Sequence, residues 1–462
     1  MAMRRFGKRV WMGVGLGLAF AGLELCSLPL AQGQAGALGI LSDPVPQGKE
    51  RIVPEVLPAK PSIPPAFTIP AEPLGYTAPN TEYMGMRWSF ASLDFLSEDR
   101  LLFTFRVPGL IRREPGDRTD QRQIRAVVLA LPTGLVEGQA TWPVHDRARY
   151  LWMLNDGHFL LRDLDGLQLG DATLEMKPFL HFPGPVLWLQ LDPRQKYLVT
   201  NSREPAAATP KPGDVAGPAS AAANVTVEGQ TPPGQPSSPG PPDMVLRILR
   251  RDSGQVMLVS RVASTVRLPL NSDGYLESLR GNGYKWMLNL NYFNGGSRVL
   301  GHVDSSCAPT YDFVSQREVL VTACESWGGH RLVAMDTDGH HLWDFLASGS
   351  GFWPQVINSA DGLRMARETL VPRHSGAPYE IVDSDDVRGQ LVRVFDAASG
   401  KVVLEVPAVP ALDAGGNVAI SPSGRRVAVL SGGAIQVFDL PAPAPLPEAA
   451  ASQPDTKQTT SP

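Results

Sequence analysis

Short hydrophobic runs separated by tight polar turns recur along the chain from about Thr81 to Leu440. Within the runs, hydrophobic and polar residues alternate over a few positions, which is typical of β-strands and not of helices. Seven of the turns have a similar polar composition: Ser97–Arg100, Asn155–Gly157, Asp192–Gln195, Ser272–Gly274, Ser315–Glu318, Ser359–Gly362 and Ser421–Gly424. The pattern therefore predicts seven similar pairs of antiparallel strands.

A second type of turn alternates with the first and joins further pairs of hydrophobic runs. Its members are Leu131–Gly134, Arg251–Gly254, Asp336–Gly339 and Asp396–Gly400, with Asn294–Gly296 a weaker example. Two hairpins per unit make four antiparallel strands. The unit repeats after 44 residues from Asp273 to Arg317, and after another 44 from Arg317 to Asp361. A four-stranded unit of this length is the sequence signature of a β-propeller blade.

The clearest internal repeat pairs two windows that share one register. Asp94–Ser97 followed by Arg100–Thr104 matches Asp312–Ser315 followed by Glu318–Thr322. Some spacings between units are longer, and each excess falls in a polar or low-complexity insertion: Pro108–Gln123, Glu204–Pro242 and Glu368–Gly389. The stretch 204–242 is rich in Pro, Ala, Gly, Ser and Thr, so we expect it to be disordered.

The units resemble the repeats of WD-repeat and quinoprotein-type β-propeller proteins. The segment ISPSGRRVAVLSGGAIQVFDL is similar to a WD-repeat blade, and LVAMDTDGHHLWDF and VRVFDAASGKVVLEV resemble quinoprotein repeats. Where WD repeats have Trp-Asp, this chain has Met335-Asp336, Phe395-Asp396 and Phe438-Asp439. The resemblance implies an all-β fold, a seven-bladed β-propeller of four-stranded antiparallel blades, and no particular activity. The last blade lacks a fourth strand, so we expect Ile435–Leu440 to pair with an N-terminal strand at Tyr83–Phe90.

The regions flanking the predicted propeller have their own compositions. Residues 1–35 read as an export signal, with four basic residues before a hydrophobic run and small residues near Ala35. Retention of this segment as a membrane anchor is the alternative. Residues 36–80 are rich in proline and predict an extended tether, and 441–462 predict a disordered tail. We expect the mature protein to be periplasmic or extracellular and monomeric, with membrane contact only through an uncleaved signal.

Charge and cysteine content narrow the functional classes. The formal net charge is −4 at pH 7, which argues against a protein that binds nucleic acid by neutralising phosphates. If the signal is removed, Cys307 and Cys324 are the remaining cysteines, and an exported pair favours a disulfide. The two positions are equidistant from the turn at Ser315-Gln316, so an unbulged hairpin would place them opposite each other. The alternative is two buried thiols displaced by a bulge.

The chain has no HExxH, CxxC, GxSxG or GxxxxGK motif, so common hydrolase, zinc and nucleotide signatures are absent. His340 and His341 are adjacent on a predicted strand and would point to opposite faces, which disfavours a shared metal. His145 could form an acid/base pair with Asp146, but a salt-bridged junction between blades is the simpler interpretation. The tryptophans at 152, 188, 286, 343 and 353 are interpreted as packing between blades. We predict no catalytic residue, metal or cofactor.

All three insertions fall between second and third strands, so they should lie on one face of the propeller. Loops on a rigid scaffold commonly carry binding residues. The candidate binding residues on this face are Arg112, Arg113, Arg118, Arg122, Arg373, His374, Asp383, Asp385 and Asp386. From Asp383, the positions that an EF-hand needs as Gly and Glu hold Arg388 and Val394, which disfavours calcium.

The favoured function is an exported, non-enzymatic binding or scaffold module for a protein, peptide or glycan. One alternative is a periplasmic dehydrogenase dependent on pyrroloquinoline quinone. The resemblance implies eight blades, a bound calcium and often adjacent cysteines for such an enzyme. A second alternative is a scaffold for envelope assembly.

Overall fold

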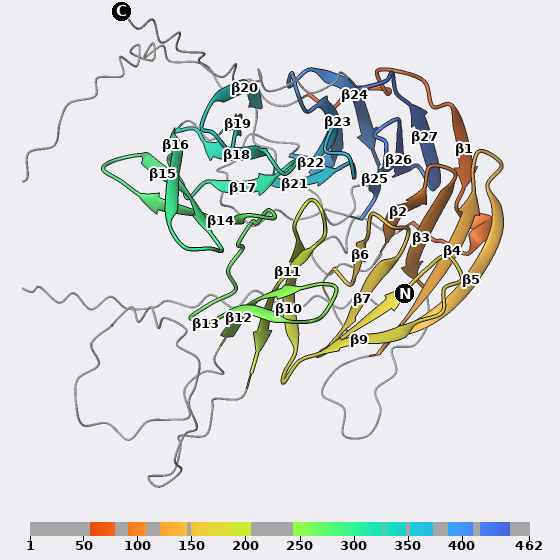
Figure 1. The fold of residues 1–462 in the computed structure, drawn as a ribbon. Coiled ribbons are helices and arrows are strands. Elements are labelled where there is room, and N and C mark those ends of the chain that lie inside the picture. The colour runs from red at the N-terminus through yellow and green to blue at the C-terminus, as the bar shows by residue number, and fades with distance from the viewer. Residues whose placement is uncertain are drawn as a thin grey trace, which may run out of the picture. The chain divides into compact units, whose positions relative to one another are not determined.

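Antiparallel β-sheet makes up almost all of the regular structure in the described part of the chain (Figure 1). This computed structural model describes residues 56–78, 91–107, 121–145, 149–204, 244–326, 329–347, 352–372, 387–409 and 416–443. They all belong to one unit, 51–462. The only helical element among them is the 3-10 turn η1 (Glu72–Leu74). No helix in this part of the chain is long and apolar enough to cross a membrane. The predicted export signal and C-terminal tail lie outside the described residues, apart from residues 441–443.

Seven sheets form the blades of a β-propeller, which confirms the predicted fold class. Blade one is β2 (Ser92–Ser97), β3 (Arg100–Arg106), β4 (Arg122–Ala130) and β5 (Leu135–Val144). Blade two is β6 (Leu151–Met153), β7 (Phe159–Asp163), β8 (Gly166–Gly170) and β9 (Lys177–His181). Blade three is β10 (Val186–Leu191), β11 (Tyr197–Arg203), β12 (Met244–Arg250) and β13 (Val256–Val262). Blade four has β14 (Gly274–Arg280), β15 (Lys285–Tyr292) and β16 (Ser297–Asp304).

The remaining blades follow the same order. Blade five is β17 (Thr310–Phe313), β18 (Glu318–Cys324), β19 (His330–Asp336) and β20 (His341–Ala347). Blade six is β21 (Phe352–Asn358), β22 (Arg364–Pro372), β23 (Val387–Asp396) and β24 (Val402–Ala408). Blade seven is β25 (Val418–Ile420), β26 (Arg426–Ser431), β27 (Ala434–Asp439) and, from the N-terminal side, β1 (Phe67–Pro70).

The seven predicted turns of the first type all connect the first and second strands of a blade. We call the face that carries them the turn face. Gly362 and Gly424 occupy the last position of two of these turns at φ of 74° and 65°, a left-handed conformation that glycine adopts without strain. The three predicted insertions fall at the connections between second and third strands, β3/β4, β11/β12 and β22/β23. Two of the predicted ranges are too wide, because Arg122 and Gln123 belong to β4, Glu368–Pro372 to β22 and Val387–Gly389 to β23. The strand ends that flank these connections lie at the edge of their blades opposite the turn face, and we call this the insertion face; most of the inserted residues themselves lie outside the described residues.

The ring is closed by a strand other than the predicted one. β1 pairs with β27 in antiparallel register, from Phe67 opposite Val437 to Pro70 opposite Ala434. The prediction of Tyr83–Phe90 is therefore wrong for the strand beside β27, and residues 79–90 lie outside the described residues. The closing strand lies within the proline-rich stretch that the sequence analysis interprets as a tether. Its proline is tolerated because β1 is an edge strand, where a residue lacking an N–H breaks no hydrogen bond between strands.

The segment before β1 is also part of the propeller. The backbone N–H of Ser62 donates to the carbonyl of Glu405 on β24 at 2.9 Å, and the Ser62 hydroxyl accepts from the Glu405 N–H at 2.9 Å. Ile63 packs on the cluster between blades six and seven. The proline-rich stretch therefore contacts the outer strand of blade six at Ser62 before it enters blade seven as β1.

Among the described residues, the hydrophobic core forms seven clusters, one at each junction between neighbouring blades. The junction of blades one and seven, for example, contains Ile69, Leu129 and Val437, each at most 5% exposed. Trp343, at the junction of blades five and six, donates from Nε1 to the Ala397 carbonyl at 2.7 Å and stacks on Phe395. For Trp343 the interpretation as inter-blade packing is confirmed.

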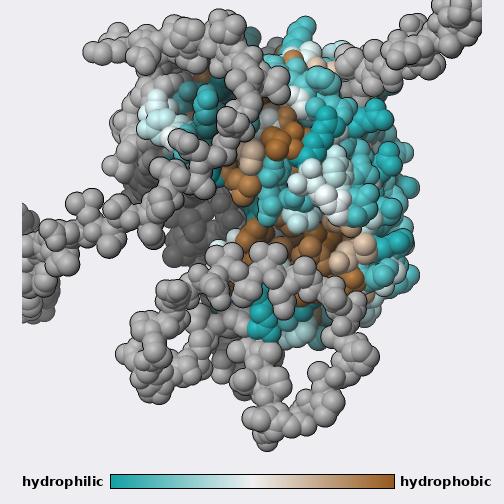
Figure 2. Space-filling model, turned by 60° about the vertical axis from the view of Figure 1, so that its left-hand side comes forward, coloured by the Kyte–Doolittle hydropathy of each residue, from teal (hydrophilic) through white to brown (hydrophobic). Residues whose placement is uncertain are grey.

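Hydrophobic side chains also remain exposed on outer strands, as at Leu135 on β5, Val259 on β13 and Val299 on β16. In Figure 2, hydrophobic patches interrupt an otherwise mostly hydrophilic surface on one side of the molecule.

Blade four departs from the regular pattern. Its innermost strand is reduced to a single bridge between Leu270 and Tyr275, supplemented by a hydrogen bond from the Leu276 N–H to the Pro269 carbonyl at 2.8 Å. The chain just before this bridge is drawn toward blade three instead. There the buried Asn201 side chain donates to the Val266 carbonyl at 2.9 Å and accepts from the Val266 N–H at 3.0 Å. Because β14 has no regular partner strand on its inner edge, its Ser278 N–H donates instead to the Tyr311 hydroxyl at 3.0 Å.

Candidate functional site

Most of the predicted binding residues lie outside the described residues. These are Arg112, Arg113, Arg118, Arg373, His374, Asp383, Asp385 and Asp386. Arg122 is described, and it is the first residue of β4, opposite Val144 on β5, with 9% of its surface exposed. Arg122 is therefore part of a strand and not of the inserted loop. The insertion-face site remains a hypothesis.

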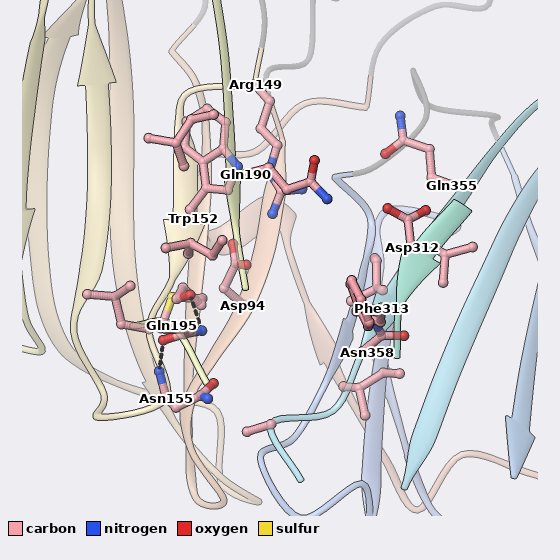
Figure 3. A pocket seen from close by; sticks show the side chains of 18 of the residues that line it. Asp94, Arg149, Trp152, Asn155, Gln190, Gln195, Asp312, Phe313, Gln355 and Asn358 are labelled. Atoms are coloured by element: carbon pink, nitrogen blue, oxygen red, sulfur yellow. Dashed lines mark hydrogen bonds between the residues drawn. The ribbon is translucent and has the colours of Figure 1, made fainter. Parts of the chain in front are cut away.

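A cavity of about 410 Å³ lies at the centre of the propeller (Figure 3). The innermost segment of every blade contributes to its wall: Asp94 from β2, Trp152 from β6, Trp188 from β10, Leu270 from blade four, Asp312 from β17, Gln355 from β21 and Ala419 from β25. We call this cavity the central channel. Its volume lies in the range of roughly 300–1,000 Å³ that is typical of small-molecule sites.

Two tryptophans on the channel wall carry arginine side chains on their rings. The Arg267 guanidinium carbon lies 4.6 Å from the centroid of the Trp188 ring. Those of Arg149 and Arg162 lie 5.3 and 5.5 Å from the Trp152 ring. Stacking on an aromatic face holds a guanidinium in a fixed orientation and leaves its edge available for hydrogen bonds. Trp152 also packs between blades two and three, whereas the sequence interpretation assigned both tryptophans to packing alone.

Two carboxyl groups face the channel from opposite walls, Asp94 on β2 and Asp312 on β17 (Figure 3). They are the first residues of the two windows that form the strongest internal repeat, so they occupy equivalent positions in blades one and five. Burial raises the pKa of both carboxyls to about 6. The effect is opposed by Ser92 and Arg149 at Asp94 and by Arg267 at Asp312.

The two ends of the channel differ in chemistry. Arg149 and Arg267 precede the innermost strands of blades two and four, and both are exposed at the end toward the insertion face. At the other end, residues of the first-to-second-strand turns hydrogen-bond to one another. The Asn155 N–H donates to Gln195 Oε1 at 2.5 Å, and the Ser272 N–H donates to Gln316 Oε1 at 2.8 Å. Gln316 also donates from Nε2 to Asp192 at 3.3 Å, which links blades five and three across blade four. The insertion-face end is therefore the end where charged side chains have hydrogen-bonding capacity to offer to a ligand.

The irregularity of blade four places Arg267. Because Asn201 holds both backbone groups of Val266, the next side chain is positioned beside Trp188 of blade three. A regular innermost strand paired with β14 would place residue 267 opposite Ser278. Asn201 is fully buried, so its two hydrogen bonds are well protected from water.

Cys307 and Cys324 form a disulfide with Cα atoms 5.5 Å apart, as predicted. The hairpin register pairs Phe313 with Val319, one residue off the symmetric register expected from the turn, and β17 begins only at Thr310. The disulfide therefore joins the segment between blades four and five to the end of β18.

The three histidines considered in the sequence lie beside aspartates. Asp146, the predicted acid/base partner of His145, lies outside the described residues, and His340 precedes β20 instead of lying on a strand beside His341. The His145 N–H donates to Asp163 Oδ1 at 2.7 Å, and His145 Nδ1 lies 3.0 Å from Asp163 Oδ2, which links blade one to blade two. His340 pairs with Asp336 and His341 with Asp344, so the two rings have separate partners. In the described part of the chain, no group of three or more His, Cys, Asp or Glu side chains is arranged to hold a metal ion.

Comparison with known proteins gives likeness to solved structures only. No family model and no curated protein matches the chain. Acylaminoacyl peptidase from Pyrococcus horikoshii is 10% identical with a TM-score of 0.42; the match covers 75% of this chain and spans about half (50%) of that one. TolB from Acinetobacter baumannii is 14% identical with a TM-score of 0.35, covering 70% of this chain and 73% of that chain.

A chain of the mitotic checkpoint complex is 9% identical with a TM-score of 0.43, covering 85% of this chain and 97% of that one. The β-propeller domain of the Trilobed protease from Pyrococcus furiosus is 10% identical with a TM-score of 0.40, covering 79% and 98%. At these identities and scores, the protein's seven-bladed β-propeller fold rests on its own sheet topology.

Proposed function

We propose that the protein is an exported β-propeller that binds its ligand at the insertion-face end of the central channel, as a binding or scaffold module without catalysis. The observation that carries this proposal is the wall of the channel. Arginines stacked on tryptophans and two carboxyls from opposite walls converge on one cavity of ligand size.

Groups of this kind at the centre of a rigid ring favour recognition of a polar ligand. Each of the seven blades supplies part of the wall, so the positions of the charged side chains are held by the whole fold. Burial of the Asp312 carboxyl is costly unless a ligand supplies a partner for it. The strands that flank the three insertions end at the same face, and we propose that the insertions extend the binding surface there.

Export is supported by the basic and hydrophobic N-terminal segment together with the Cys307–Cys324 disulfide, since disulfides persist in oxidising compartments. The quinone-dependent dehydrogenase is disfavoured, because the resemblance implies eight blades for that class and this propeller has seven. The envelope-assembly scaffold is a special case of the binding module in which the ligand belongs to another envelope protein.

A thermal-shift screen against amino acids, short peptides and oligosaccharides tests channel binding. Thr310→Trp places a large side chain at an exposed position of the channel wall, and Gln139→Trp makes the same change on the exposed outer strand of blade one. At least one ligand class should raise the melting temperature of the wild type and of Gln139→Trp, but not of Thr310→Trp. If no class gives a shift, or if Thr310→Trp responds like the wild type, the channel is not the binding site. Recovery of the protein in the cytoplasmic fraction of its host would contradict export.

A further inference from the structure

We infer that the channel recognises a zwitterionic ligand of the amino-acid or short-peptide class, with its carboxylate on Arg267 and its ammonium group on Asp312. This inference rests on the proposed function and specifies its ligand. The observation behind it is a cation and an anion that line the same channel without forming a direct ion pair.

Arg267 is positioned before any ligand arrives. Its guanidinium is stacked 4.6 Å above Trp188, and its backbone neighbour Val266 is held by Asn201. No hydrogen bond or ion pair uses the guanidinium within the described residues. A planar, oriented guanidinium with an open edge matches a carboxylate, to which it can donate two parallel hydrogen bonds.

Asp312 offers the complementary charge. It lies on β17 of the next blade, within the electrostatic range of Arg267, yet the two side chains form no direct ion pair. Its carboxylate likewise accepts no hydrogen bond from the described residues. Gln355, on β21 of blade six, lines the same wall of the channel and offers both a donor and an acceptor (Figure 3). A ligand ammonium group would give the Asp312 carboxylate the direct cationic partner that it lacks among the described residues.

A second arginine and aspartate on the channel wall, Arg149 and Asp94, have more hydrogen-bond partners within the protein. Asp94 accepts a hydrogen bond from Ser92, and Arg149 donates from Nε to the Leu151 carbonyl at 3.0 Å. The repeat thus provides an internal control. Asp94 and Asp312 have equivalent places in their blades, but only the Asp312–Arg267 pair has both members open.

Isothermal titration of the full chain at pH 7.5 with tri-alanine and its blocked forms tests the inference. N-acetylation removes the ammonium group, and C-amidation removes the carboxylate. Either modification should weaken binding to the wild type at least tenfold. This comparison needs no variant, so it does not depend on whether a substituted protein folds.

Three substitutions test which side chain binds the ammonium end of the ligand and which binds its carboxylate end. Asp312→Asn should bind acetylated and free tri-alanine within about twofold of each other, because the partner of the ammonium group is gone. Arg267→Met should lose discrimination between the amide and the free acid in the same way. Asp94→Asn should keep both discriminations. Free alanine binding as tightly as tri-alanine supports an amino-acid ligand, and affinity that rises with length supports a peptide; both uphold the zwitterion.

Equal binding of the three tri-alanine forms would overturn the inference, as would loss of discrimination in Asp94→Asn but not in Asp312→Asn. Failure of tri-alanine and alanine to bind, combined with a thermal shift by another ligand class that Thr310→Trp suppresses, would overturn the zwitterion but leave channel binding standing.

Discussion

Closure of the propeller depends on Ile69, so replacing this residue by alanine should weaken the whole ring. Ile69 is 5% exposed and packs with Leu430, Ile435 and Val437 of blade seven and with Leu129 of blade one. A Cβ placed on Gly134, in the turn of blade one, would lie 3.1 Å from the Ile69 side chain, so the fit there is close. The residue thus joins the first and last blades.

The expected loss follows from the volume removed. Substitution of a buried isoleucine by alanine costs about 2–5 kcal/mol, depending on how far the site collapses. Because β1 is an edge strand and can adjust, we expect about 3 kcal/mol for Ile69→Ala. Thr68→Ala is the matched control, since Thr68 is the preceding residue of β1 and is exposed; its effect should stay within about 0.5 kcal/mol.

Equilibrium urea denaturation of the two variants, followed by tryptophan fluorescence, gives both free energies. A loss below about 1 kcal/mol for Ile69→Ala, or equal losses for the two variants, would refute the reasoning that β1 closes the ring.

Three further predictions follow from individual contacts. Replacing both Cys307 and Cys324 by serine should lower the free energy of unfolding by about 3 kcal/mol, since the bridge spans 17 residues; a change below 1 kcal/mol in urea denaturation would contradict it. Arg364→Met should cost about 3 kcal/mol, because Arg364 is 1% exposed and pairs with buried Asp396 at 3.1 Å. Arg426→Met, at the exposed pair with Asp439, should cost less than about 1 kcal/mol, and equal costs would contradict the role of burial. Asp312→Asn should stabilise the protein at pH 7.5 by about 1–2 kcal/mol but not at pH 3, with channel water reducing the full effect. The folded pKa of about 6 lies above the ordinary 3.8, so the wild type loses stability as the pH rises through 6; a benefit independent of pH would contradict it.

The blades were predictable because turn chemistry and strand alternation are local. Ser359–Gly362 and Ser421–Gly424 combine a serine, an aspartate or proline and a glycine whose left-handed conformation ends the turn. Hairpins built on such turns need no knowledge of distant contacts. The disulfide pairing was predictable from the two cysteines, but its position was not. Cys307 lies before β17, and the one-residue shift in register at Phe313 depends on how the connection between β17 and β18 folds.

The closing strand was not predictable in this way. Phe67–Pro70 has four residues, one of them proline, within a proline-rich stretch, and its partner β27 lies more than 360 residues away along the chain. The preference of edge strands for such residues becomes informative only when the missing place in blade seven is known. Tyr83–Phe90, by contrast, is more hydrophobic and directly precedes blade one.

The channel site was hidden for a related reason. The repeat that pairs Asp94 with Asp312 was visible in the sequence, but it indicated a common blade position and not a cavity. The blade order places both carboxyls on innermost strands. It therefore predicts that they lie near the centre of the ring. The position of Arg267 could not be predicted, because it depends on Asn201 pulling the innermost segment of blade four toward blade three.

A crystal structure of the protein soaked with tri-alanine, at a concentration that saturates the titration, tests the central claim most directly. The account predicts the peptide in the channel, with its carboxylate on the Arg267 guanidinium and its ammonium group on Asp312. An empty channel at that concentration, or a peptide bound elsewhere on the propeller, would contradict it.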